Sequence, residues 1–263
     1  MVASGGDHLP LDLGAALVTA HEQPWLEPDN LLADLDSLAS DLHIPAGSPG
    51  VQQVARLNHH LFTTLGFRGD EEVYDAPFNS YLDRVLERRK GLPILLSVVY
   101  LEVARRVGVA CEGVSFPGHF LVATQGHDPR FFVDPFGRGT ILRVDQLLGL
   151  LAKRLGRPVM AMEDAEQYLA PCSHRAILIR MNNNLKASFL RRRDDLGALR
   201  AVDRLEILDP AQPDLQRDRA LLLARLDRPQ EAVAPLEAYL DARPEAEDAV
   251  ELAVFLEQLK ALG

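Results

Sequence analysis

The chain has 263 residues, a formal charge of −10 at neutral pH, and 47% hydrophobic residues. A chain of this length and composition can bury one large core or two smaller ones. The acidic balance argues against non-specific binding to nucleic acid or to an anionic membrane, so we expect neither as a partner.

Motifs for cofactors, metals and membranes are missing from the sequence. Cys111 and Cys172 are too few for a disulfide framework and lack the spacing of metal ligands. Glycine-rich nucleotide-binding motifs are absent, as are a signal peptide and a long apolar run. We therefore expect a globular protein of the cytoplasm with no cofactor and no bound metal.

The first part of the sequence predicts helices. Apolar residues recur at helical spacing from Leu11 to about Leu65, interrupted by prolines. A shorter helix is expected just before Gly91, and Asn79 or Ser80 is placed to cap its N-terminus.

The segment LPILLSVVYLEVARRVG is apolar on almost all sides, which predicts a buried central helix over residues 92–107. Pro93 suits the first turn, and Gly108 suits the C-terminal end. At 100° per residue, Ser97 shares an inward face with Pro93. The opposite, better solvated face is expected to carry the charged residues of the segment: Glu102, Arg105 and Arg106.

Short β-forming runs follow Gly108, separated by Gly, Pro and Asp residues typical of turns. They predict an antiparallel sheet packed on the central helix. From Val144 to the end the pattern is helical again. We therefore expect an α+β fold, with the helical N-terminal region and the sheet in one domain over residues 1–172 and an all-helical domain over residues 173–263.

The helical tail contains an internal repeat. Ala198, Val202, Leu205 and Pro210 recur as Ala232, Leu236, Tyr239 and Pro244, each shifted by 34 residues. This period resembles the tetratricopeptide pattern, in which stacked helix pairs bury a shared face. An ordinary helical extension is the alternative.

His119 and Asp134 form the most suggestive pair of polar residues. They lie fifteen residues apart at the ends of neighbouring predicted strands, so a hairpin could bring the two side chains together. A histidine oriented by a carboxylate is the base half of a Ser-His-Asp or Cys-His-Asp triad. A purely structural hydrogen bond is the simpler interpretation, and the spacing leaves both open.

The order of these motifs resembles the transglutaminase-like (papain-like) fold. In particular, RRKGLPILLSVVY, GVSFPGHFLV, FVDPFGRG and RMNNNLK, followed by the repeat, resemble the SirB1 family of transglutaminase-like and tetratricopeptide-containing proteins over almost the whole chain. The resemblance implies a transglutaminase-like core. It also implies that His119 and Asp134 occupy the positions of the catalytic histidine and aspartate.

The cysteine nucleophile of that family pattern is missing. Transglutaminase-like enzymes carry it at the N-terminus of the central helix, where the helix dipole lowers the pKa of the thiol. Counting back fifteen residues from Gly108 reaches Pro93, and the neighbouring positions carry no nucleophile. Ser97, one helical turn further along, is the first alternative. The remaining candidates would need an unfamiliar geometry: Cys111, Ser115 and Cys172.

Four further residues are candidates for binding a ligand or partner. Asn79 could orient a site instead of capping a helix. Arg89 could bind an anionic group instead of forming a surface ion pair. Pro117 and Gly118 form a tight approach to His119, which could act as a recognition lip.

Three functions remain open from the sequence. The leading hypothesis is a non-catalytic transglutaminase-like regulatory protein, with a vestigial His119–Asp134 dyad, that binds a protein or peptide through its helical repeats. The alternative is a hydrolase or acyl-transfer enzyme using Ser97 with these two residues. A third is metal or small-ligand binding at His119, which His127 could join although a third ligand is not evident.

Overall fold

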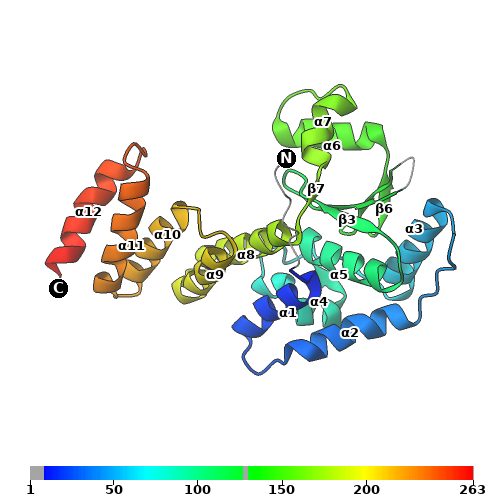
Figure 1. The fold of residues 1–263 in the computed structure, drawn as a ribbon, viewed down its shortest axis with the longest axis horizontal. Coiled ribbons are helices and arrows are strands. Elements are labelled where there is room, and N and C mark those ends of the chain that lie inside the picture. Colours follow the sequence, from blue (N-terminus) through cyan, green and yellow to red (C-terminus); the bar gives the residue numbers. More distant parts are fainter. Residues whose placement is uncertain (1–8, 127–129, 263) are drawn as a thin grey trace, which may run out of the picture. The chain divides into compact units, whose positions relative to one another are not determined.

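The computed structural model describes residues 9–126 and 130–262 (Figure 1). The chain divides into two compact units, residues 1–178 and 179–263, and this division falls within α8 (His174–Arg191). The sequence placed a domain boundary at 172/173, which stays a prediction because α8 contributes to both units.

Unit 1, residues 1–178, begins with helices and ends with a sheet and two covering helices. Its first elements are α1 (Leu11–Glu22), α2 (Pro28–Ser40), α3 (Gly50–Asn58), the π-helix η1 (His59–Thr64), β1 (Arg68–Gly69), the 3-10 helix η2 (Pro77–Ser80), α4 (Leu82–Arg88), β2 (Lys90–Gly91) and α5 (Pro93–Arg106). The later elements are β3 (Cys111–Val114), β4 (Leu121–Thr124), β5 (Phe132–Asp134), β6 (Thr140–Leu142), α6 (Val144–Leu155), α7 (Met162–Leu169) and β7 (Pro171–Cys172).

The five-stranded sheet has the order β6-β5-β4-β3-β7, and all its neighbours are antiparallel. In Figure 1, α5 lies on one face of this sheet and α6 with α7 on the other. Apolar side chains from both the strands and α6–α7 form one core cluster, which includes Phe116, Leu121 and Leu151. The predicted α+β class is confirmed, and the β-forming runs predicted after Gly108 correspond to β3, β4, β5 and β6.

Three two-residue strands were not predicted: β1 and β2, which pair with each other, and β7. Cys172 was expected in a helical region, which is wrong, because it lies in β7 and pairs with Gly113 of β3. A two-residue strand is too short to show the alternation by which a strand is recognised in a sequence.

The central helix α5 is buried at every position from Pro93 to Ala104. It starts with the predicted proline and ends before Gly108, whose φ of 77° is the left-handed conformation that favours glycine. The expectation of a solvated face was wrong for Glu102, which is 2% exposed. Its carboxylate accepts hydrogen bonds from Arg105 Nε at 2.9 Å and Arg106 Nη1 at 2.7 Å, which offsets the cost of burying a charge.

The start of α4 also differs from the prediction. Asn79 and Ser80 lie in η2, and α4 begins at Leu82. Thr19 of α1 supplies the capping interaction instead, because its Oγ1 accepts a hydrogen bond from the Leu82 N–H at 2.9 Å. The hydrogen bond expected from a neighbouring N-cap residue thus comes from Thr19, 63 positions earlier in the sequence.

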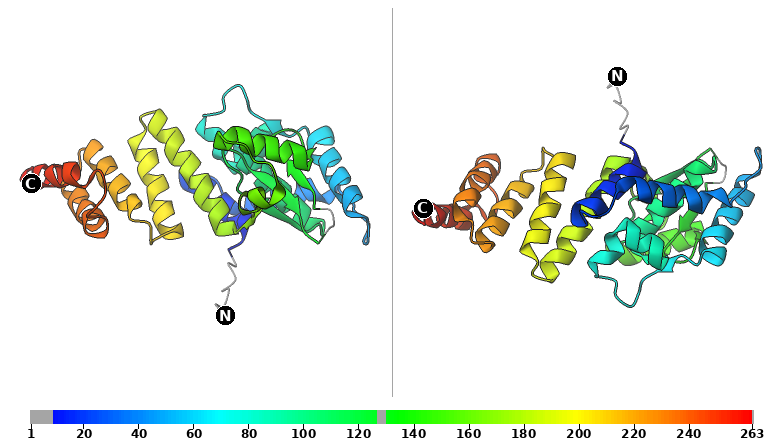
Figure 2. Two further views of the ribbon diagram at one scale, coloured as in Figure 1. Left: turned by 90° about the horizontal axis from the view of Figure 1, so that it is seen from above. Right: turned by 90° about the horizontal axis from the view of Figure 1, so that it is seen from below.

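Unit 2, residues 179–263, contains the C-terminal part of α8 and four more helices. These are α9 (Asp195–Leu208), α10 (Asp214–Arg225), α11 (Pro229–Ala242) and α12 (Ala249–Ala261). Successive helices pack side by side (Figure 2). The predicted repeat is confirmed, because each apolar position of the 34-residue period is buried in both copies: Ala198, Val202 and Leu205 in α9, and Ala232, Leu236 and Tyr239 in α11.

Across residues 9–126 and 130–262, the combination of length and apolar character that a membrane-crossing helix requires is not found in any helix.

Truncating a repeat position tests the stacking in unit 2. Leu236 is fully buried, so we expect Leu236→Ala to lower the free energy of unfolding by about 2–5 kcal/mol, measured by urea denaturation. Val254 is 59% exposed, so Val254→Ala should change it by less than about 0.5 kcal/mol. Equal losses in the two variants would contradict the assignment of Leu236 to a shared buried face.

Candidate functional site

The structure brings His119 and Asp134 together. His119 Nε2 lies 2.8 Å from Asp134 Oδ1, and their side chains are 15% and 17% exposed. Because an ionised carboxylate only accepts hydrogen bonds, Nε2 is the donor in this contact. His119 lies in the turn before β4, and Asp134 ends β5, the strand next to it.

Phe136 supports this pair. Its backbone N–H donates a hydrogen bond to Asp134 Oδ1 at 3.0 Å, and its ring contacts the His119 ring edge-on with 6.0 Å between centroids. A Cβ added at Gly69 would lie 2.6 Å from the Phe136 ring, so only glycine leaves room for the ring there. Sequence reasoning did not single out Phe136, because its role depends on a distant glycine.

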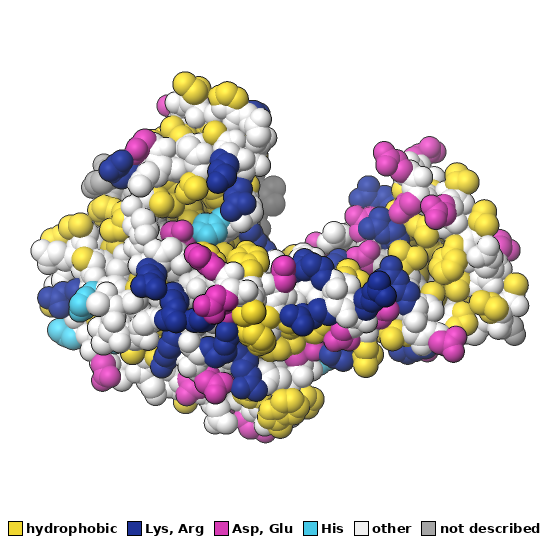
Figure 3. Space-filling view, turned by 180° about the vertical axis from the view of Figure 1, so that it is seen from behind, with side chains coloured by type: hydrophobic (Ala, Val, Ile, Leu, Met, Phe, Trp, Pro, Cys, Tyr) yellow, Lys and Arg dark blue, Asp and Glu magenta, His cyan; other side chains and the backbone are white. Residues whose placement is uncertain are grey.

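A groove of about 370 Å³ is lined in part by Phe136, whose ring contacts His119. Gly137 also lines it, as do Lys90 and Glu72, which pair at 3.3 Å. Arg68 and Arg138 also line it, so the groove has a mixed charge. Charged side chains of both signs are likewise interspersed over the face shown in Figure 3.

The start of α5 offers no nucleophile and no access. Pro93 is its first residue, and Ile94, Leu95 and Leu96 are each at most 2% exposed. This is the position at which the family pattern places the reactive cysteine. The helix dipole still points there, but the turn that would hold a reacting atom is filled with apolar side chains.

Ser97 is also enclosed. Its side chain is 0% exposed, and its Oγ donates a hydrogen bond to the Pro93 carbonyl oxygen at 2.8 Å. A hydroxyl that bonds the carbonyl four residues earlier is the usual arrangement for serine within a helix. This burial and this bond argue against Ser97 as a nucleophile, because a substrate must reach the attacking oxygen.

The remaining candidate nucleophiles lie on the sheet. Burial, together with the charge of Glu112, raises the pKa of the Cys111 thiol to about 12, which opposes formation of the reactive thiolate. Cys172 donates a hydrogen bond to the Gly113 carbonyl oxygen at 3.3 Å. Ser115 is exposed just after β3.

Asn79 lies in a buried network rather than at a helix cap. Its Nδ2 donates to the Val73 carbonyl oxygen at 2.8 Å, and its Oδ1 accepts from Arg88 Nη1 at 2.8 Å. Arg88 also pairs with Asp70 at 2.5 Å and lies over the Phe78 ring at 4.2 Å. The sequence pointed to Arg89, but Arg88 is the arginine that holds this region together.

The lip before His119 is in contact with α6. Gly118 has a φ of 62°, and a Cβ added to it would lie 3.2 Å from Arg154 Nη1. Arg154 therefore lies over the Pro117–Gly118 turn, next to the segment that carries His119. No sequence signal linked this arginine, 36 residues after Gly118, to the lip.

His119 was the residue at which the sequence left a metal site open. Among residues 9–126 and 130–262, His, Cys, Asp and Glu side chains do not form a group of three or more that could hold a metal ion. His127, the suggested second ligand, lies outside the described residues.

Comparison with known proteins places this fold in a family. Residues 29–183 match the family described as transglutaminase-like superfamily. The chain belongs to this superfamily. Residues 185–257 match the tetratricopeptide repeat, as the internal period predicted.

Three similar proteins extend the comparison. A UPF0162 protein of Xylella fastidiosa is 37% identical over 240 residues, covering 90% of this chain and 85% of that one. The mouse F-box only protein 21 is 29% identical over 167 residues, which are 60% of this chain and 27% of that protein. A crystal structure of menin matches with a TM-score of 0.47 and 12% identity, over 94% of this chain and 65% of that chain. The family match and the Xylella relative confirm the predicted resemblance to the SirB1 family.

From the Asp70–Arg88 pair we predict how the free energy of unfolding depends on pH. Burial would raise the pKa of Asp70, but the hydrogen bonds from Arg88 and Val73 and the charge of Arg88 outweigh it, so the pKa falls below its usual 3.8. The pair therefore stabilises the fold above about pH 4, and this stability is lost as the pH falls through the lowered value. We expect Asp70→Asn to cost about 2–3 kcal/mol at pH 7 and progressively less in acid.

Urea denaturation between pH 7 and pH 3 measures this effect. Glu71→Gln is the matched control, because Glu71 is the exposed neighbour of Asp70. A constant difference between wild type and Asp70→Asn over this range would show that the carboxylate charge does not contribute.

Proposed function

We propose that this chain is a partner-binding protein whose transglutaminase-like domain carries out no cysteine chemistry and whose repeat unit binds a protein or peptide. The main support is that a buried proline, Pro93, occupies the first position of α5, where a nucleophile would be needed. The proposal includes a cytoplasmic setting, in keeping with the reduced thiols of Cys111 and Cys172.

In this proposal the His119–Asp134 pair has a structural role. The hydrogen bond ties the turn before β4 to the end of β5, and Asp134 also anchors the following loop through the Phe136 N–H. Both contacts are complete without a substrate. A histidine and an aspartate can thus persist after the chemistry is lost, because they hold the loop that carries Phe136.

The repeat unit supports the binding part of the proposal. Tetratricopeptide repeats in general mediate contacts between proteins, and stacked helix pairs present extended surfaces to peptides. Large apolar side chains are exposed on this unit: Ile207 at 79%, Val250 at 80% and Val254 at 59%. Scattered exposed apolar side chains are common, so these residues are positions to test rather than a defined site.

The alternative, a hydrolase using Ser97 with His119 and Asp134, requires a movement that opens the buried serine. Metal or small-ligand binding at His119 lacks a set of three ligands within the described residues. Neither alternative has an observation in its favour beyond the dyad itself.

Reagents that modify reactive serines and cysteines test the proposal that this domain carries out no catalysis. A fluorophosphonate should leave Ser97 unmodified, because its side chain is fully buried. Iodoacetamide at pH 7.5 should modify Cys111 only after denaturation, because burial raises the pKa of its thiol to about 12. Mass spectrometry of the intact, folded protein reads out both. Rapid labelling of wild type that disappears in Ser97→Ala would establish the serine enzyme and remove the proposal.

Photo-crosslinking tests the binding part. We expect a benzoylphenylalanine at Ile207 or Val250 to form a discrete adduct with a protein in extract of the native host cells. Trp25 is the matched control, because it is 75% exposed but lies in unit 1. Adducts from position 25 alone, or from none of the three positions, would contradict partner binding through the repeats.

A further inference from the structure

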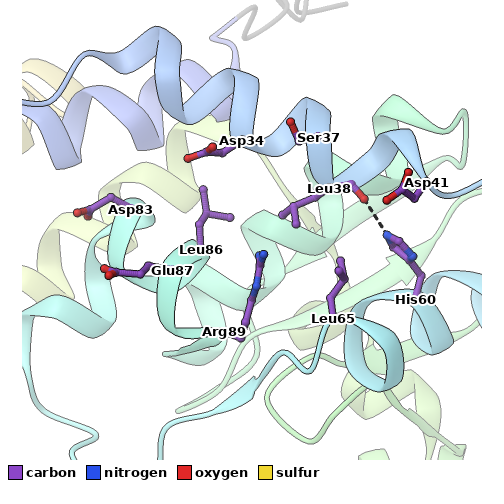
Figure 4. A pocket seen from close by; sticks show the side chains of 10 residues that line it. All are labelled: Asp34, Ser37, Leu38, Asp41, His60, Leu65, Asp83, Leu86, Glu87 and Arg89. Atoms are coloured by element: carbon purple, nitrogen blue, oxygen red, sulfur yellow. Dashed lines mark hydrogen bonds between the residues drawn. The ribbon is translucent and has the colours of Figure 1, made fainter.

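A second pocket lies away from the dyad, among α2, η1 and α4. It has a volume of about 550 Å³, within the range of small-molecule sites. Figure 4 shows the Arg89 side chain extending into it toward α2, with Leu86 and Leu65 on either side. Leu38 adds to this apolar part of the lining.

The guanidinium of Arg89 has N–H donors that an anionic ligand could use. Its backbone has φ 56° and ψ 23°, a left-handed end to α4 where glycine is the common residue, yet a long cation occupies the position. The guanidinium lies 4.8 Å from the Phe67 ring centre, and no acceptor among the described residues takes a hydrogen bond from it. Burial lowers the pKa of Arg89 from its usual value, and the charge of Asp34 only partly opposes this. A guanidinium has five N–H donors and matches a carboxylate with two of them.

The rim of the pocket is acidic. Asp34, Asp41, Asp83 and Glu87 line it. Asp83 and Glu87 are engaged by Arg84, at 3.3 Å and 2.9 Å. Within the part of the chain that the structure describes, Asp34 and Asp41 form no ion pair at contact distance, although the charge of Asp34 acts on Arg89 across the pocket.

The pocket is held in shape by its own elements. His60 is 8% exposed, and its Nε2 lies 2.7 Å from the Leu38 carbonyl oxygen, to which it must donate. This bond fixes α2 against η1 (Figure 4). A site formed on packed helices loses little entropy when it takes up a ligand.

The pocket contains both a guanidinium and carboxylates, which restricts the kind of ligand that fits it. A phosphate would meet four carboxylates, and a polyamine would meet the Arg89 guanidinium. A ligand with one carboxylate, an aliphatic stem and a terminal cation satisfies both kinds of group and covers the leucines.

We propose that this pocket binds a basic amino acid through its free carboxylate and its cationic side chain, either as the free amino acid or as the C-terminal residue of a peptide. Arg89 takes the carboxylate, and Asp34 and Asp41 take the cation. This site is separate from the repeat unit and does not depend on the function proposed above.

Calorimetric titration of the full chain tests the assignment with L-lysine, Nα-acetyl-L-lysine and L-lysinamide. We expect saturable binding of lysine or acetyl-lysine, and at least tenfold weaker binding of lysinamide, which lacks the carboxylate. Tighter binding of lysine than of acetyl-lysine identifies the free amino acid, and equal or tighter binding of acetyl-lysine identifies a peptide C-terminus.

Two variants and one control make the test specific. In Arg89→Gln the difference between lysine and lysinamide should disappear, and Asp34→Asn should weaken lysine and acetyl-lysine by about tenfold. Lys90→Gln is the matched control, because Lys90 is the next residue but lines the other groove. If Arg89→Gln does not fold, Asp34→Asn and the ligand comparison decide alone.

Three results would overturn the proposal. They are the absence of saturable binding of lysine and acetyl-lysine up to about 10 mM, equal affinity for lysine and lysinamide in wild type, and a loss in Lys90→Gln as large as in Asp34→Asn.

Discussion

Unit 1 depends on the burial of α5 from Pro93 to Ala104. A helix that is apolar on all sides has to be covered on all sides, and here the sheet covers one side while α1, α2 and α4 cover others. Glu102 is the buried charge on this helix. Since a buried carboxylate is costly without partners, the helix also needs Arg105 and Arg106 in fixed positions, and these in turn reach Asp12 of α1 and Asp36 of α2. Burial and charge therefore select the same packing of the N-terminal helices.

The parts of the fold that the sequence predicted are those with a local signal. The helix over 93–106 has its proline and glycine at the two ends, and the four main strands have turn residues between them. The repeat could be found because equal burial at equivalent positions imposes equal residue types. The parts that were missed depend on distant partners: the short strand at Cys172, the buried Glu102, and the cap that Thr19 supplies to α4.

In the candidate site, too, some features had a local sequence signal and others depended on distant residues. The contact of His119 with Asp134 followed from hairpin geometry, and the missing nucleophile followed from counting along α5. Phe136, Arg88 and Arg154 carried no signal, because each acts through a residue that only the folded chain brings near. The enclosure of Ser97 was equally beyond the sequence, since the same inward face could have lined a cleft.

The ion pairs between α5 and the N-terminal helices also constrain how the chain is made. The partners of Asp12 and Asp36 lie 93, 94 and 70 residues later in the sequence. At a synthesis rate of about 5–20 residues per second, α1 waits roughly 5–20 s for the arginines that complete its surroundings. During this time the apolar faces of α1 and α2, including Leu11, Leu31 and Leu35, have no central helix to cover them. The order of synthesis thus leaves these faces without their native cover until residue 106 has emerged.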